Sequence, residues 1–176
     1  MKKLLLILLC FPMIGFGQSA NDLFEKGNEL FEQEDYLNAK INYSLSLELN
    51  KYNWLCYQKL AIIAQIEGDN HTVIKNGNKA IDLANHETDL YHMVGRAYYK
   101  LNMYEEALLE FTTWINKEKR NMTGAHPSRW SGMMILEMRG FCYLYLGDKE
   151  SACKDWNWSA ELKWSSAEKN IEKYCN

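Results

Sequence analysis

The chain has 176 residues, of which 20 are Lys or Arg and 23 are Asp or Glu, so its formal net charge at pH 7 is −3. This length is enough for one domain with a substantial hydrophobic core. The mild acidity argues against nucleic acid or an anionic membrane surface as the main partner.

The first 17 residues have the pattern of an export signal. Two lysines precede the apolar run Leu4–Leu9, and Gly15 and Gly17 are the small residues expected at −3 and −1 of a cleavage site before Gln18. The apolar run is too short to span a bilayer, which takes about 20 residues. We therefore predict a periplasmic or secreted protein that loses residues 1–17 and does not insert into a membrane afterwards. Loss of the two lysines would leave 18 basic residues against 23 acidic ones, a net charge of −5.

Cys10 is the residue in this segment that could carry a lipid. A lipoprotein signal has small residues before its cysteine, whereas the bulky Ile7, Leu8 and Leu9 precede Cys10 here. The apolar stretch also continues beyond Cys10. We therefore do not expect a lipoprotein.

From residue 20 onward, the same pattern of residue sizes returns every 34 residues. Each repeat reads as two amphipathic helices joined by a short turn. Three repeats follow one another directly, and an insertion separates them from the fourth: 20–53, 54–87, 88–121, insertion 122–132, and 133–166. A small residue at the eighth position lets the two helices approach closely: Gly27, Ala61, Gly95 and Gly140.

The second helix of each repeat has its own pattern of inward-facing residues. A small or β-branched residue comes first: Ala39, Val73, Ala107 and Ala152. Four residues later comes an aromatic residue in three of the repeats: Tyr43, Phe111 and Trp156. Gly77 takes that position in the second repeat, and Trp114 is unusually large for its position in the third. We therefore expect irregular packing around the second and third repeats.

This pattern resembles the tetratricopeptide repeat family, over nearly all of the chain after residue 17. The resemblance implies an all-α domain over residues 18–176, a right-handed α-solenoid of about four helix pairs. Residues 164–175 have helical spacing and would form the capping helix that a solenoid needs over its last apolar face. The proline that usually follows the second helix of this repeat is absent, with Lys51, Asn85, Lys119 and Trp164 in its place.

Motifs of catalysis or of metal and cofactor binding are missing from the sequence. It contains no HExxH, no CxxC and no His/Cys pair at metal-ligand spacing. It also lacks a G-x-S-x-G elbow and Gly-rich phosphate loops. The stretches "GDNH" and "GDKE" fall in the turns between helices, where Asp69 and Asp148 would act as helix caps. We therefore expect no enzyme activity, no cofactor and no metal.

The resemblance also implies where a partner would bind. In this family the first helices of successive pairs line a concave groove that commonly receives a peptide or a helix of a partner. The corresponding residues here mix aromatic, amide and charged side chains: Phe24, Asn28, Phe31, Gln58, Ile62, His92, Arg96, Tyr99 and Glu137. The sequence thus predicts a non-catalytic scaffold for a protein or peptide partner. The alternative is a structural subunit of an envelope or secretion assembly, held through its convex face, its insertion or its terminal helix.

Two further features bear on partner binding. Some family members grip the C-terminal carboxylate of a partner with lysine, asparagine and arginine side chains. Of the corresponding positions only Asn28 matches, the others being Phe24, Lys59, Asp89 and Met93, so we do not expect that mode of binding. Trp130 in the insertion is either a contact point for a partner or the start of an extended first helix against which it packs.

The cysteines divide into two groups. In the register of this family, the position of Cys153 turns toward the next layer, which Cys175 closes, and this stretch resembles the end of exported bacterial repeat proteins. We predict a Cys153–Cys175 disulfide, with two packed thiols or a metal or redox pair as alternatives. Cys56 and Cys142 lie two repeats apart, too far to pair, and we expect both to be buried apolar residues.

Overall fold

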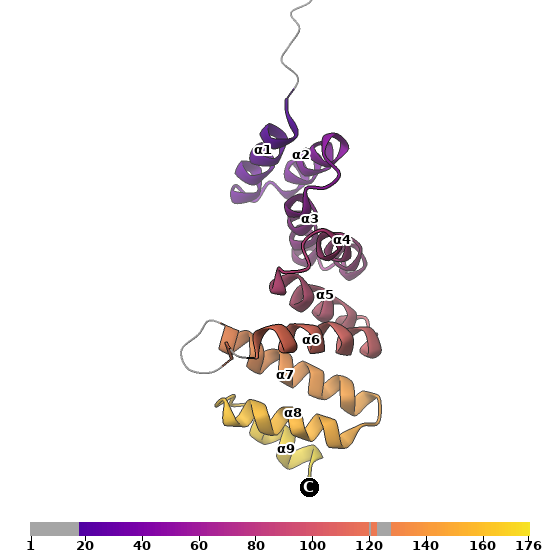
Figure 1. Cartoon of the computed structure of the whole chain (residues 1–176), viewed down its shortest axis with the longest axis vertical. Coiled ribbons are helices and arrows are strands. Elements are labelled where there is room, and N and C mark those ends of the chain that lie inside the picture. Colours follow the sequence, from indigo (N-terminus) through magenta and orange to yellow (C-terminus); the bar gives the residue numbers. More distant parts are fainter. Residues whose placement is uncertain (1–17, 120, 123–127) are drawn as a thin grey trace, which may run out of the picture.

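The computed structural model describes residues 18–119, 121–122 and 128–176, and this part of the chain forms α-helices stacked in chain order (Figure 1). The predicted export signal lies outside the described residues. The helices are α1 (Ala20–Glu32), α2 (Tyr36–Leu49), α3 (Trp54–Glu67), α4 (Asn70–Leu83), α5 (Thr88–Lys100), α6 (Tyr104–Glu118), α7 (Ser128–Tyr145), α8 (Lys149–Glu161) and α9 (Ala167–Tyr174). Each helix packs on the next one in the chain. The fold is therefore the predicted all-α solenoid of helix pairs with a C-terminal helix.

The turns between the two helices of each pair share one backbone conformation. Each has a residue with positive φ just before the second helix: Glu34, Gly68, Asn102 and Gly147. In three of the turns the next residue is an aspartate, whose side chain accepts a hydrogen bond from the backbone N–H three residues on: Asp35, Asp69 and Asp148. These bonds satisfy N–H groups that a helix start would otherwise leave unpaired. The turns therefore act as caps, as the sequence predicts for Asp69 and Asp148.

Contacts between a glycine and an aromatic ring set the spacing of three helix pairs. A Cβ atom placed on the glycine would lie within 3 Å of the ring opposite: Gly27 on Tyr43, Gly95 on Phe111 and Gly140 on Trp156. All three rings are fully buried. Only a residue without a side chain allows this approach, so these glycines are required by packing and not by backbone conformation.

The second pair reverses this arrangement. Ala61 takes the place of the glycine and Gly77 that of the ring. Gly77 packs instead against Val94, so that α4 approaches α5 of the following pair. The expected irregularity at the second repeat is thus a transfer of the close contact to the next pair.

The insertion is partly helical. Residues 128–132 form the start of α7, and residues 123–127 lie outside the described residues. Met122 is fully buried, and its side chain lies against Gly132. The two ends of the insertion are therefore packed into the core of the third and fourth pairs.

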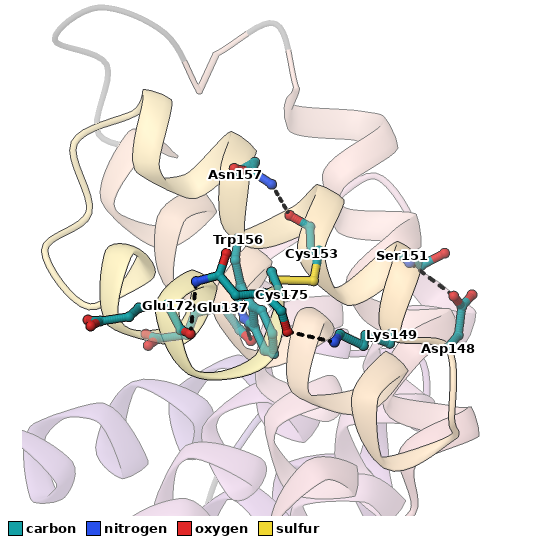
Figure 2. Close-up of a disulfide and its surroundings, with 10 residues drawn as sticks. Glu137, Asp148, Lys149, Ser151, Cys153, Trp156, Asn157, Glu172 and Cys175 are labelled. Atoms are coloured by element: carbon teal, nitrogen blue, oxygen red, sulfur yellow. Dashed lines mark hydrogen bonds between the residues drawn. A yellow bond between two sulfur atoms is a disulfide. The ribbon is translucent and has the colours of Figure 1, made fainter.

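The C-terminal helix is fastened to the last pair at several points. A disulfide joins Cys153 in α8 to Cys175, with 5.8 Å between their Cα atoms (Figure 2). The Glu137 carboxylate accepts hydrogen bonds from Trp164 Nε1 at 2.7 Å and from Asn170 Nδ2 at 3.1 Å. The predicted disulfide is confirmed, and Cys56 and Cys142 are buried free thiols as expected.

Replacing Gly95 by Ala tests the glycine contact. The added methyl group would lie 2.8 Å from two ring carbons of Phe111. Overpacking a core costs about 1–3 kcal/mol, against a gain of about 1 kcal/mol in helix propensity. We expect Gly95→Ala to lower the free energy of unfolding by up to about 2 kcal/mol in urea denaturation followed by circular dichroism. The loss should shrink when Phe111→Leu is also present, and an equal loss in both backgrounds would contradict this contact.

Removing the disulfide tests how the cap is held. The bridged cysteines are 22 residues apart in sequence, and a cross-link of this span is worth about 3 kcal/mol through its effect on the unfolded chain. We expect the double variant Cys153→Ser/Cys175→Ser to lose about this much stability. Because repeats contact only their neighbours, amide exchange should accelerate in α9 and leave α3 unchanged. Free thiols at both positions in a non-reducing peptide map would rule out the bridge.

Candidate functional site

The residues predicted to meet a partner lie on the first helix of each pair, α1, α3, α5 and α7. On α1, Phe24 is only 8% exposed and packs against Tyr43, so it offers a partner little surface. Asn28 is half-buried and accepts a hydrogen bond from the Tyr43 hydroxyl at 2.9 Å. Phe31 lies under the Lys59 ammonium, 4.5 Å from its ring centroid. Phe31 and Lys59 therefore form a contact between α1 and α3 at this face.

A basic hollow borders this face, and we define it by Gln65, Asn70, Arg96 and Lys100. It lies between α3, α4 and α5, and its floor is apolar: Val73, Met93 and Ala97. Arg96 and Lys100 are one turn apart on α5, and neither has an ion-pair partner among the described residues. The hollow is too shallow to enclose a ligand, but its rim combines two amide side chains with two cations that have no ion-pair partner among the described residues, which suits an anionic group bound at the surface.

His92 lies one turn before Arg96 on α5 and is half-buried beside Trp114, with 6.4 Å between the ring centroids. Burial, with a smaller contribution from the Arg96 charge, lowers the pKa of His92 to about 4. The ring is therefore neutral at pH 7, and its buried Nε2 has no hydrogen-bond partner among the described residues. The positive charge of this region comes from Arg96 and Lys100 alone.

An aromatic row follows the basic hollow; we define it by Tyr99, Tyr104, Tyr145 and Phe141. Tyr99 meets Tyr104 edge-on at 6.0 Å, and Tyr104 stacks on Tyr145 at 4.6 Å. Phe141 lies beside Tyr145 and contacts Tyr174 of α9. Tyr145 is exposed and the other three rings are half-buried. A partner can therefore contact these rings while they stay packed against the core. Burial raises the pKa of Tyr99 to about 12, so its hydroxyl stays protonated.

The remaining predicted residues have different surroundings. Gln58 and Ile62 are half-buried on α3. Both carboxylate oxygens of Glu137 already accept hydrogen bonds from the C-terminal segment. Trp130 lies within α7, is 70% exposed and meets Trp164 edge-on at 6.2 Å. The extended first helix considered from the sequence is therefore observed, and contact of Trp130 with a partner stays a prediction.

Sequence reasoning placed Gln65 and Phe141 among the groove-facing candidates but missed Lys100 and Asn70 of the hollow and Tyr104 and Tyr145 of the aromatic row. Tyr104 and Tyr145 are 41 residues apart, and no linear spacing connects them. The one available signal is that Lys100 follows Arg96 by four residues, which places both cations on one helix face.

The described residues contain neither a candidate metal site nor a candidate membrane-spanning helix. Among them, no group of three or more His, Cys, Asp or Glu side chains is arranged to hold a metal ion. In the same part of the chain, no helix has the length and apolar character that crossing a bilayer requires.

No protein-family model and no curated protein sequence matches this chain. Solved structures do match it. YrrB, described as a TPR protein with an unusual peptide-binding site, is 16% identical with a TM-score of 0.70, over 88% of this chain and 74% of its own. MamA residues 41 to the end, from Desulfovibrio magneticus RS-1, is 14% identical with a TM-score of 0.67, over 82% of this chain and 76% of its own.

A third structure is the first TPR of Spaghetti (RPAP3) bound to the HSP90 peptide SRMEEVD. It is 27% identical with a TM-score of 0.54, and covers 59% of this chain and 82% of its own. Together these likenesses show that the chain has the tetratricopeptide repeat fold. The resemblance seen in the sequence is confirmed at this level.

The titration of His92 can be measured directly. A histidine with a pKa of about 4 when folded and 6.5 when unfolded binds its proton more readily in the unfolded chain. The neutral, buried imidazole therefore contributes its full share to the free energy of unfolding above pH 6.5. This share is lost as the pH falls toward 4. We expect an NMR titration to give a pKa near 4 for the imidazole signal that disappears in His92→Asn. Between pH 6.5 and 4, the free energy of unfolding should fall less in this variant than in the native chain. The difference between the two falls should be at most about 3 kcal/mol. An imidazole pKa near 6.5 would contradict the burial.

Proposed function

We propose that the protein is a non-catalytic scaffold that binds a peptide or protein partner on the face formed by its first helices, centred on α5. The observation that carries this proposal is the pair of unpaired cations, Arg96 and Lys100, beside the amides of Gln65 and Asn70. A hollow of this kind suits a carboxylate better than a neutral group, because the guanidinium of Arg96 can donate two parallel hydrogen bonds to it.

The aromatic row adds a second requirement for the partner. Tyr99 lies one turn beyond Arg96 on α5, so a segment that places a carboxylate in the basic hollow can also lay an apolar or aromatic side chain on Tyr99 and Tyr145. Aromatic and arginine side chains supply much of the binding energy of protein interfaces. We therefore favour a partner segment with an acidic residue followed within a few positions by an apolar one.

Two of the structural neighbours support peptide binding. YrrB is described as having a peptide-binding site, and the RPAP3 domain is bound to an HSP90 peptide that contains acidic residues. In this chain Phe24 is buried and Asn28 is bonded to Tyr43, so Arg96 and Lys100 are better placed to receive an acidic group.

We also propose that the protein acts outside the cytoplasm. The sequence of residues 1–17 supports export, and the Cys153–Cys175 bridge suits an oxidising compartment. The N-terminal sequence of the protein recovered from its native cells should begin near Gln18.

A second candidate function is a structural subunit of an envelope or secretion assembly. The exposure of Trp130 at the start of α7 favours it, since an isolated exposed tryptophan is a frequent contact residue. In that case Trp130→Ala would abolish association, and changes in the basic hollow would leave it intact.

Charge reversal in the basic hollow distinguishes these functions. We expect Arg96→Glu/Lys100→Glu to reduce recovery of the partner at least tenfold in affinity capture with quantitative mass spectrometry. The matched control is Lys75→Glu/Lys169→Glu, which changes the net charge equally at exposed lysines of α4 and α9 and should leave recovery unchanged. Equal recovery by both variants would exclude the hollow as the binding site. Tyr145→Ala should weaken binding to a smaller extent, since it removes one ring face.

A further inference from the structure

We infer that α2 forms an interface between two copies of this chain. Four aliphatic side chains, Leu37, Ile41, Leu45 and Leu49, follow one another at every fourth residue and form a ridge along the helix, the α2 ridge. They are between 40% and 67% exposed. The opposite side of α2 is occupied by residues that pack in the core, including Ala39 and Tyr43. The solvent-facing side of a helix is normally polar. Contact with water therefore does not explain the apolar ridge of α2, and exposed apolar patches of this kind often mark interfaces.

The geometry of the ridge suits another helix with the same spacing. Side chains at i, i+4 and i+8 form the ridges that interdigitate in the commonest class of helix packing, at a crossing angle of about −50°. From Leu37 to Leu49 the ridge extends about 18 Å along the axis, at 1.5 Å per residue. A second copy presents an identical ridge, and a two-fold axis lets each copy meet the same surface of the other.

The charges at the ends of α2 favour an antiparallel pair. The acidic residues Glu34 and Asp35 lie just before the helix, whereas its other end carries the exposed Glu48 and the exposed Lys51, whose charges cancel. With the two-fold axis between Ile41 and Leu45, the acidic end of one copy lies beside the end of the other copy that has no net charge, and the two acidic ends stay apart. A parallel pair would instead place like charges together. The antiparallel arrangement also aligns the two helix dipoles favourably.

The polar residues beside the ridge tolerate being covered. The side chains of Asn42 and Ser44 donate hydrogen bonds to backbone carbonyls of α2 itself, at 2.9 and 2.8 Å. Lys40 is paired with Glu67 of α3 at 2.6 Å. These groups keep their partners when a second helix excludes water, so the cost of covering polar groups beside the ridge is confined to the exposed Glu48 next to Leu49.

This interface is independent of the proposed partner site, because α2 contributes no residue to the basic hollow. A lipid surface is the rival occupant. The acidic chain and the pairing of Lys40 make an anionic membrane the poorer match, since interfacial helices depend on free basic residues beside their apolar face.

The test is sedimentation velocity of the full chain as purified, with its intact mass recording whether residues 1–17 are present. We expect a dimer that forms with increasing concentration, and Leu45→Glu should raise the dissociation constant at least tenfold. Leu37→Glu should do the same and serves as a second variant if Leu45→Glu fails to fold. Leu109→Glu is the matched control, because Leu109 is an exposed leucine on α6, and it should leave association unchanged. A monomer at all concentrations would overturn the inference, as would equal association by Leu45→Glu and Leu109→Glu.

Cross-linking tests the arrangement. Mixing Ile41→Cys with Leu45→Cys chains in the presence of a short bis-maleimide should link position 41 of one chain to position 45 of the other. The native thiols of Cys56 and Cys142 are buried, and burial raises the pKa of both, so they should not react. Cross-links only between identical positions, or none, would overturn the antiparallel pair. So would binding of anionic vesicles by a chain that does not self-associate.

Discussion

The arrangement of this protein depends on how closely the two helices of each pair can approach. In three pairs a glycine of the first helix accepts an aromatic ring of the second, and the ring fills the space that a Cβ atom would take. In the second pair the small residue is Gly77, on the second helix, and it accepts Val94 of α5. This shift brings Met93 onto the floor of the basic hollow and places Arg96, one turn later, at its rim. The packing irregularity and the candidate site are therefore parts of one feature.

The two ends of the solenoid differ in how their apolar surfaces are covered. A stack of repeats must cover its last apolar face, and here α9 does so through the disulfide and through Glu137. Arg139 and Asp155 form a buried bidentate ion pair in the same region, with both bonds at 2.7 Å. Each of these charges depends on the other, because a buried charge without a partner is costly. Among the described residues, the first pair has no such fastening, and α2 presents its apolar ridge to the exterior.

The basic hollow on α5 and the α2 ridge lie on separate helices, so a scaffold could use both at once. A dimer formed through α2 would present two basic hollows in a fixed relation. Two such sites could hold a partner with repeated acidic segments more tightly than either alone, because the second binding event becomes intramolecular. Self-association would then serve partner binding without contributing a residue to the site.

The amino-acid sequence by itself determined the period of 34, the helix pairs and the capped turns, and the family that it resembles suggested the pairing of Cys153 with Cys175. These features are encoded in the spacing and size of residues close in the chain, or in a register that repeats. Only the tertiary structure decided that Phe24 is buried, that Glu137 is used by the cap, and that Tyr104 meets Tyr145. Which side of a helix faces a neighbour depends on how successive pairs are rotated against one another. That rotation arises from non-local packing, such as the contact of Gly77 with the next pair, and residue spacing within one repeat does not specify it.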